Sequence, residues 1–327
     1  MEQNIKIILI QLFILFLFIL LFTIIKKFQN IKPIMPSILP TTDQLTEKKY
    51  SSTLAILNIY FIQVIIYLFQ TDQLQFPNNP YNKIIKFLPQ GTNIIKILNY
   101  TCSILTVNIN SIGKPTTIGG MILEYNNTSF IVLRGTQLDC EWKLDATLLL
   151  EKPSWAKFTK DFKVHGGFNY VYTSISDDGT NLRDEIFNYL VKKNPENIII
   201  TGHSIGGGLR NLIAADMSIN FPNFRSKTKF FTTAAPYSGN QEFVNSIMNS
   251  SISPVYTGIF STINNSDPVP TTKLPGYTRI PSQLFCFSEP GKSAHLPITY
   301  RKGLEKNAAQ FDSGSSLNKV SCGLDCK

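Results

Sequence analysis

The chain has 327 residues, of which 43% are hydrophobic and 16% are charged. This composition supports a substantial core in one large α/β domain or two ordinary domains, and it excludes a chain that is disordered overall. The net charge of +9 is compatible with attraction to anionic lipid headgroups and equally with an ordinary solvated surface. We expect no nucleic-acid partner, and the sequence leaves the oligomeric state open.

The N-terminal segment is predicted to cross a membrane. Between Ile7 and Ile25 only Gln11 and Thr23 are polar, which is about the apolar length that one span requires. No small residues that would suit a cleavage site follow it, and this favours an uncleaved signal anchor over a cleaved signal peptide. We predict a membrane segment over residues 1–28, a proline-containing linker over 29–47, and one folded domain over 48–327.

The orientation of this membrane segment is indicated by two conflicting signals. Lys26, Lys27 and Lys32 follow the span, and this bias favours a cytoplasmic body. Five cysteines and several glycosylation sequons instead favour a lumenal or extracellular body; the sequons begin at Asn99, Asn126, Asn127, Asn249 and Asn264. We predict a single-pass protein with its folded domain on the lumenal or extracellular side, with secretion as the alternative.

A second apolar run extends from Leu54 to Phe69. It is short for a membrane span, and it contains the polar residues Asn58 and Gln63. We therefore predict a buried helix that packs on the folded domain.

The stretch "IIITGHSIGGGLRNLIAAD", residues 198–216, is typical of a strand, a tight turn and a helix. A phosphate-binding P-loop is excluded because no lysine follows Gly208, and a dinucleotide fingerprint is excluded because Asn211 occupies the place of its third glycine. The pattern Gly202-His203-Ser204-Ile205-Gly206 fits a nucleophile elbow, in which a serine sits on a strained strand-to-helix turn. A glycine-rich loop without catalytic meaning is the alternative interpretation.

A serine nucleophile needs a general base, and the chain has three histidines. His203 is adjacent to Ser204, where consecutive side chains diverge, so we expect it to pack against neighbouring strands. His165 precedes the elbow, whereas the base follows the acid and the nucleophile in a doubly wound hydrolase. His295 is therefore the predicted base, with a surface histidine as the alternative.

The predicted acid is Asp267, which lies between Ser204 and His295 and gives the order serine, acid, histidine. It follows the stretch "PVYTGIFSTINNSD", which we interpret as a strand at the edge of the sheet that leads into a loop. Active-site residues of open α/β sheets gather in such loops. The alternative role of Asp267 is to cap an Asx-type turn, because Asp-Pro pairs commonly start turns.

Five motifs in this order resemble the class 3 lipases, the fungal triacylglycerol lipase-like branch of the α/β-hydrolases. They are "FIVLRGT", "VHGGF", "ITGHSIGGGL", "FTTAAPYSGN" and "NNSDPVP". The resemblance covers about Gly119 to Leu304. It implies an α/β-hydrolase fold, with a mainly parallel central sheet flanked by helices, which here follows one N-terminal membrane helix.

The resemblance also implies roles for further residues. Thr136 would be the first oxyanion-hole residue, through its backbone N–H and its hydroxyl, and Ile205 would be the second, through its backbone N–H. The segment after Thr136 is similar to the family's lid helix, whose apolar residues here are Leu138, Trp142 and Leu144. Acidic residues and a lysine make this lid polar, so a short-chain, monoacyl or phospholipid substrate is as plausible as triacylglycerol.

The sequence departs from the family pattern in three places. Arg210 replaces a small residue behind the elbow, Ala234-Ala235 replaces an aromatic-glycine pair, and Asp267 and His295 are closer together in sequence than is typical.

We predict a serine ester hydrolase that acts on a lipid ester, an acylglycerol or a phospholipid, without a cofactor or a metal. The alternative is a lipase-fold membrane protein with impaired catalysis that binds lipid or a protein partner. A peptidase or thioesterase is also consistent with triad chemistry alone.

Overall fold

The computed structural model describes residues 31–47, 49–72, 84–102, 116–156, 161–176, 179–248, 258–291 and 293–313. The predicted membrane segment, residues 1–28, lies outside the described residues.

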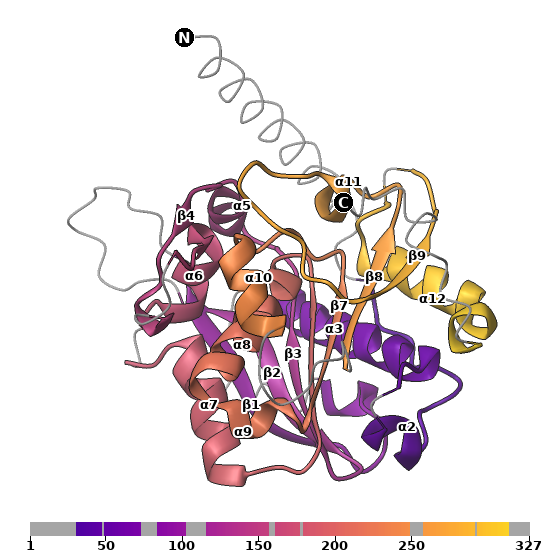
Figure 1. Ribbon diagram of the computed structural model, residues 1–327. Helices are drawn as coiled ribbons and strands as arrows, with labels where there is room; N and C mark the ends of the chain where they lie inside the picture. Colours follow the sequence, from indigo (N-terminus) through magenta and orange to yellow (C-terminus); the bar gives the residue numbers. More distant parts are fainter. Residues whose placement is uncertain are drawn as a thin grey trace.

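A seven-stranded sheet forms the centre of the molecule, in the order β1-β2-β3-β6-β7-β8-β9. β1 to β3 pair antiparallel, whereas β3, β6, β7, β8 and β9 pair parallel. The mainly parallel sheet flanked by helices (Figure 1) confirms the predicted fold class. The strands are β1 (Asn93–Thr101), β2 (Thr116–Tyr125), β3 (Thr128–Leu133), β6 (Ile198–His203), β7 (Thr228–Thr233), β8 (Ile259–Asn264) and β9 (Gln283–Phe287), with a small separate pair, β4 (Leu150–Glu151) and β5 (Val164–His165).

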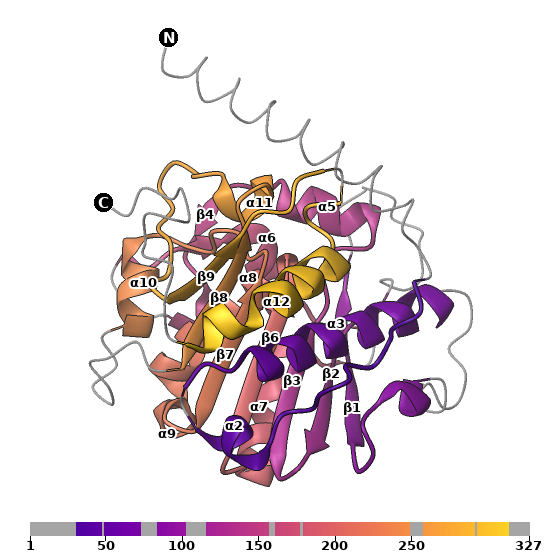
Figure 2. The same ribbon diagram turned by 90° about the vertical axis from the view of Figure 1, so that its right-hand side faces the viewer.

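Helices cover both faces of the sheet. α3 (Ser52–Asp72) and α12 (Pro297–Asp312) lie side by side on one face (Figure 2). The other face carries α6 (Gly166–Thr173), α7 (Leu182–Lys193), α8 (Ile205–Asn220) and α10 (Gln241–Met248). Short helices connect the rest: α2 (Thr42–Thr46), η1 (Ile85–Phe87), α5 (Asp139–Asp145), η2 (Ser154–Ala156), α9 (Pro222–Arg225) and α11 (Pro268–Thr271).

The central strand β6 shows why the sheet is buried on both faces. Ile198 and Ile200 pack in the core beneath α8, whereas Ile199 packs in the core beneath α3. Successive side chains of a strand point to opposite faces, so an unbroken run of isoleucine is what a doubly covered parallel strand requires. The predicted buried strand at Ile198 to Ile200 is confirmed.

The predicted buried helix over residues 54–69 is α3. Among the described residues, α3 is the helix that is long and apolar enough to cross a membrane, and 78% of its most apolar window is buried inside the fold. Its buried side chains form one core with β2, β3 and α12. We therefore confirm α3 as a core helix.

The residues predicted as a linker contain the short helix α2. Leu45 on this helix is fully buried, and the Lys229 ammonium donates to the carbonyl oxygens of Gln44 (2.8 Å) and Glu47 (2.9 Å). This part of the chain is therefore attached to the end of the sheet near β7.

Two sequence-based interpretations are wrong. β8 lies between β7 and β9, so it is an inner strand and not the edge of the sheet. Asn264, which begins a predicted sequon, is fully buried, and its amide donates to two backbone carbonyls. A buried, hydrogen-bonded asparagine is not available for glycosylation, whereas Asn126 and Asn127 are exposed in the turn between β2 and β3.

Candidate active site

Ser204 lies at the turn between β6 and α8, where the sequence predicts a nucleophile elbow. Its backbone has φ 56° and ψ −125°, a strained conformation for a residue with a side chain. A Cβ on Gly202 would lie 2.0 Å from the carbonyl oxygen of Gly206, and a Cβ on Gly206 would lie 2.4 Å from that of Arg134. Only glycine fits at both positions, and this lets the strand and the helix approach closely around the serine.

The structure brings the three predicted catalytic residues together. The Ser204 hydroxyl oxygen lies 2.8 Å from His295 Nε2, and His295 Nδ1 lies 2.7 Å from Asp267 Oδ2. Because a carboxylate only accepts, Nδ1 carries the proton, and Nε2 is left to accept from the serine. All three residues are buried. The short interval between Asp267 and His295 does not prevent this contact.

The positions of these residues follow from the sheet. Ser204, Asp267 and His295 come after the carboxyl ends of the parallel strands β6, β8 and β9. The carboxyl ends of parallel strands meet at one edge of a sheet, and side chains in the loops beyond them converge there. Residues far apart in sequence thus reach hydrogen-bond distance.

Asp267 uses its two carboxylate oxygens for different tasks. Oδ1 accepts from the backbone N–H of Val269 at 3.0 Å and caps α11. Oδ2 accepts from His295 and also from the Tyr300 hydroxyl, at 2.7 Å. The structure therefore contains both the Asx-type cap and the contact with the histidine that the sequence left as alternatives.

Tyr300 and Asn264 are site residues that the sequence analysis missed. The Tyr300 hydroxyl, fully buried on α12, fixes the acid, while the Asn264 amide donates to the carbonyl oxygen of Ala294 (3.0 Å) in the loop that carries His295. Burial, with the Asp267 charge next, raises the pKa of Tyr300 well above its ordinary value, so the hydroxyl keeps its proton. In a single sequence, neither residue differs from an ordinary core residue.

The two histidines that the sequence analysis excluded as the base lie elsewhere. His203 contacts the Thr233 hydroxyl (2.9 Å) through Nδ1 and the His295 carbonyl oxygen (2.9 Å) through Nε2. Burial, and then the neighbouring His295, lower the pKa of His203 well below its ordinary value, so its ring is neutral. His165 caps α6 through the N–H of Phe168. His203 therefore supports the loop that carries His295.

Thr136 and Ile205, the predicted oxyanion-hole residues, lie next to the serine. A Cβ on Gly135 would lie 3.4 Å from Ser204 Cβ, and Ile205 begins α8 directly after the serine. Within the described part of the chain, the backbone N–H of neither residue has a hydrogen-bond acceptor, although both residues are buried. Buried N–H groups are nearly always paired, so two free donors beside a serine are what a developing oxyanion would require.

The predicted lid residues lie on or next to α5. Leu138 precedes the helix, Trp142 is buried, and Leu144 is half-buried against the core. The acidic residues of α5 face inward: Glu141 is fully buried, and Asp145 Oδ2 accepts from the Thr136 hydroxyl at 2.7 Å. The inner face of α5 therefore carries two carboxyl groups beside an aromatic ring.

Arg210, the unusual residue behind the elbow, is almost completely buried on α8. Its guanidinium lies 5.0 Å from the centre of the Phe230 ring, and Nη1 donates to Asn211 Oδ1 at 2.7 Å. Burial, and then the charge of Arg225, lower its pKa well below the ordinary value. These contacts lie in the layer between α8 and β7, and neither is made with a residue of the triad.

A groove of about 240 Å³ lies between the helices α3 and α12. It is bounded by α3, the start of α12 and the segment around residue 31, and aliphatic side chains such as Ile34, Ile66 and Ile298 line it. Leu296 and Gln137 also line it, and they directly follow His295 and Thr136 in the chain. The groove therefore begins one residue away from the predicted base and from a predicted oxyanion donor.

Together, this sheet and the serine, histidine and acid at its carboxyl edge define an α/β-hydrolase. Residues 130–276 match the family model described as Lipase (class 3). The matched segment contains Ser204, Asp267, Thr136 and α5, and it ends before His295.

Several solved structures are similar to this chain. A lipase from Rhizopus microsporus var. chinensis is 19% identical with a TM-score of 0.49, covering 83% of this chain and 90% of the other. The Rhizomucor miehei lipase propeptide complex is 16% identical with a TM-score of 0.48, covering 83% and 88%. Lipase II from Rhizopus niveus is 20% identical with a TM-score of 0.47, covering 77% and 83%.

Proposed function

We propose that this protein is a carboxylic ester hydrolase that acts on lipid esters through Ser204, His295 and Asp267. The observation that carries the proposal is the continuous chain of hydrogen bonds from the Ser204 hydroxyl through the His295 ring to the Asp267 carboxylate, at 2.8 Å and 2.7 Å. A serine hydroxyl becomes a nucleophile when a neutral imidazole accepts its proton, and a buried carboxylate stabilises the imidazolium that forms.

The proposed reaction has two steps. Ser204 attacks the ester carbonyl while His295 Nε2 takes its proton, and the N–H groups of Thr136 and Ile205 bind the oxyanion. His295 then gives the proton to the departing alcohol, which leaves an acyl-enzyme on Ser204. Water, deprotonated by the same histidine, then attacks this ester; the bond to Ser204 Oγ breaks, His295 returns the proton to Oγ, and the acid is released.

A lipid substrate is supported by the groove whose lining includes Leu296 and Gln137, the chain neighbours of His295 and Thr136. Its aliphatic lining suits an acyl chain, because apolar surface gains free energy when it leaves water. Lys32, Arg301, Lys302 and Glu305 also line the groove, so both signs of charge are available to a headgroup. The lining of the groove is therefore compatible with an acylglycerol and with a phospholipid as substrate.

The proposed location is the lumenal or extracellular face of a membrane, with the N-terminal segment as the anchor. A disulfide between Cys102 and Cys140 supports this side, and Cys286 is disulfide-bonded as well. Disulfides persist in oxidising compartments and are rare in the cytosol.

The test is hydrolysis of p-nitrophenyl butyrate and of a long-chain p-nitrophenyl ester by the full-length protein in detergent micelles. We expect the Ser204→Ala variant to lose at least about 1,000-fold in kcat/KM. Ser218→Ala, a half-buried serine on the same helix, is the control and should keep wild-type activity. Equal rates in wild type and Ser204→Ala would overturn the proposal.

Labelling with a fluorophosphonate separates an enzyme from a lipid-binding protein of the same fold. We expect wild type to be modified at Ser204 and the Ser204→Ala variant to remain unlabelled. Association with liposomes without labelling of Ser204 would instead favour the non-hydrolytic alternative.

A further inference from the structure

The helix α5 holds the backbone turn that precedes it through two buried acidic side chains, Glu141 and Asp145. Glu141 Oε2 accepts from the backbone N–H groups of Gln137 (2.6 Å) and Leu138 (3.0 Å). Asp145 Oδ2 accepts from the Thr136 hydroxyl at 2.7 Å. Three consecutive residues, one of which is a proposed oxyanion donor, are therefore fixed by one short helix.

Arg134 completes this arrangement from the other side of the turn. Its guanidinium donates to both carboxylate oxygens of Glu141, at 2.6 Å and 2.9 Å, and to the Gly135 carbonyl oxygen at 2.8 Å. Burial alone would raise the pKa of Glu141, but the charge and hydrogen bonds of Arg134 lower it below the ordinary value. The buried pair is therefore ionised and bidentate, the arrangement that restricts orientation most strongly.

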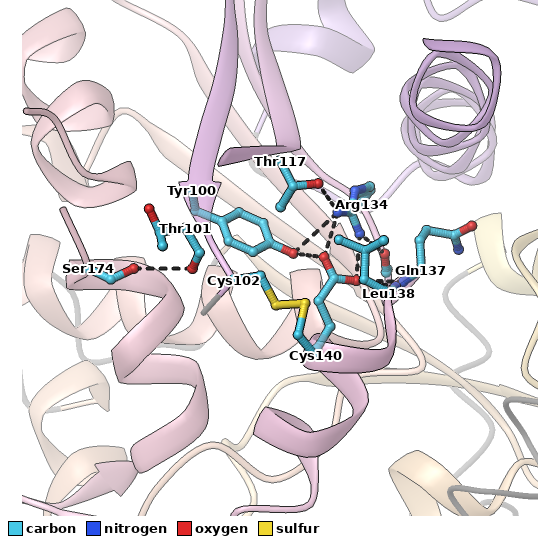
Figure 3. Close-up of a disulfide and its surroundings, with 11 residues drawn as sticks. Tyr100, Thr101, Cys102, Thr117, Arg134, Gln137, Leu138, Cys140 and Ser174 are labelled. Carbon is cyan, nitrogen blue, oxygen red and sulfur yellow. Dashed lines mark hydrogen bonds and ion pairs between the residues drawn. A yellow bond between two sulfur atoms is a disulfide. The ribbon is translucent and has the colours of Figure 1, made fainter. Parts of the chain in front are cut away.

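A disulfide attaches the same helix to the sheet. Cys140, the neighbour of Glu141 on α5, is bonded to Cys102, which directly follows β1, with 5.9 Å between their Cα atoms. Tyr100 on β1 donates its hydroxyl to Glu141. Figure 3 shows the disulfide beside the cluster of Tyr100, Arg134 and the carboxylate between them.

The other end of α5 is also held in place. The His165 ring nitrogen Nε2 lies 3.2 Å from the Asp145 carbonyl oxygen. A Cβ on Gly167 would lie 2.0 Å from the carbonyl oxygen of Leu144, so α6 packs against α5 without space between them. The first turn and the last turn of α5 are thus both anchored to the body of the fold.

A helix that swings away from a site must release whatever holds it. For α5 this would mean breaking a disulfide and separating a buried ion pair. Contact with a lipid surface does neither. We propose that α5 is a fixed clamp, in which Glu141 and Arg134 are positioning residues, and that the Cys102–Cys140 disulfide locks the Thr136 oxyanion donor in place. The protein therefore hydrolyses dissolved esters without activation at a lipid–water interface, and it loses this activity when the disulfide is broken. This inference rests on the proposed ester hydrolase function.

The test compares wild type with the Cys102→Ser/Cys140→Ser variant on p-nitrophenyl butyrate. For wild type we expect a hyperbolic rate curve, without a jump where the ester exceeds its solubility or when phosphatidylcholine vesicles are added. For the variant we expect kcat to fall about 10-fold or more, because a misplaced donor loses part of the roughly 100-fold effect of one oxyanion contact. Its KM should change less than about twofold. A reducing agent would also open the disulfide at Cys286. The double variant removes the Cys102–Cys140 disulfide alone.

Glu141→Gln and Lys143→Gln form a matched pair on α5. Glu141 is fully buried and Lys143 is exposed, so we expect the first substitution to lower kcat and the second to leave it unchanged. If Glu141→Gln does not fold, the kcat of the double cysteine variant tests the inference. A folded double variant with wild-type kcat, or a wild type active only above ester solubility, would overturn the inference. Absence of Ser204-dependent hydrolysis in wild type would instead overturn the proposed function.

Discussion

At the scale of single residues, the site depends on side chains that combine a structural contact with a proposed chemical one. Asp267 caps α11 through one oxygen and holds His295 through the other. Thr136 donates its hydroxyl to Asp145, which leaves its backbone N–H as the donor available to an oxyanion. The sequence resemblance implied that both the backbone N–H and the hydroxyl of Thr136 would bind the oxyanion. In the structure the hydroxyl is already bonded to Asp145.

Asp145 makes stability depend on pH. Burial raises its pKa from the ordinary value of 3.8 to about 8, which the Thr136 hydrogen bond opposes only in part. The folded protein therefore retains a proton that the unfolded chain releases between these values. This contribution to stability is fully present below pH 3.8 and is lost as the pH rises through about 8.

We expect Asp145→Asn, which cannot ionise, to remove this pH dependence. The difference in melting temperature between variant and wild type should become more positive from pH 5 to pH 9. The free energy of unfolding of wild type should fall by about 1.4 kcal/mol for each pH unit between the two pKa values. Differential scanning calorimetry at several pH values measures it, with the exposed Asp139→Asn as control. A difference that stays constant over this range would contradict the raised pKa.

At the scale of elements, β6 and α8 form the elbow because two glycines permit a contact that any side chain would block. A Cβ on Gly206 would lie 2.4 Å and 2.5 Å from the carbonyl oxygens of Arg134 and Leu133. These are backbone atoms at the end of β3, so the helix and the strand would have to move apart. The same contact holds α8 beside the turn that carries Thr136.

Gly206→Ala should therefore impair both stability and activity. We expect overpacking to cost about 1–3 kcal/mol in the free energy of unfolding. Because the movement separates Ile205 from Thr136, kcat/KM for p-nitrophenyl butyrate should fall at least about 10-fold. Ser218→Ala on the same helix is the control. An alanine variant with wild-type activity and melting temperature would show that the elbow tolerates a side chain.

At the scale of the whole molecule, a helix from near the start of the described chain, α3, and the last helix, α12, form one layer. α3 and α12 pack side by side over the sheet (Figure 2). Asp312 at the end of α12 accepts from the backbone N–H of Ser52, the first residue of α3, at 2.7 Å. Because α12 begins two residues after His295, α3 supports the element that follows the proposed base.

Asp312→Ala should loosen this layer. It leaves an N–H of the first turn of α3 without its acceptor, and loss of a helix cap costs about 1 kcal/mol, with a range up to about 2. Urea denaturation followed by tryptophan fluorescence measures the change, with Gln310→Ala, an exposed residue on α12, as control. An unchanged midpoint would show that the contact does not contribute to stability.

Local patterns in the sequence were enough to predict the local features of this protein. Apolar runs and glycine spacing are local properties, so they were sufficient to predict the buried strand β6, the elbow at Ser204 and the core helix α3. Chain order and the family motifs indicated Asp267, His295, Thr136 and Ile205. Their catalytic roles stay predictions, while the structure brings Ser204, His295 and Asp267 within hydrogen-bond distance.

Contacts between elements that are distant in sequence became visible in the folded structure. It placed β8 inside the sheet, buried Asn264, brought Tyr300 to the acid, and joined Cys102 to Cys140. It also turned the polar residues of α5 inward, where Glu141 meets Arg134. The physical reason is that a residue's type and spacing indicate which face of an element it occupies, whereas its partner depends on which other elements pack against that face.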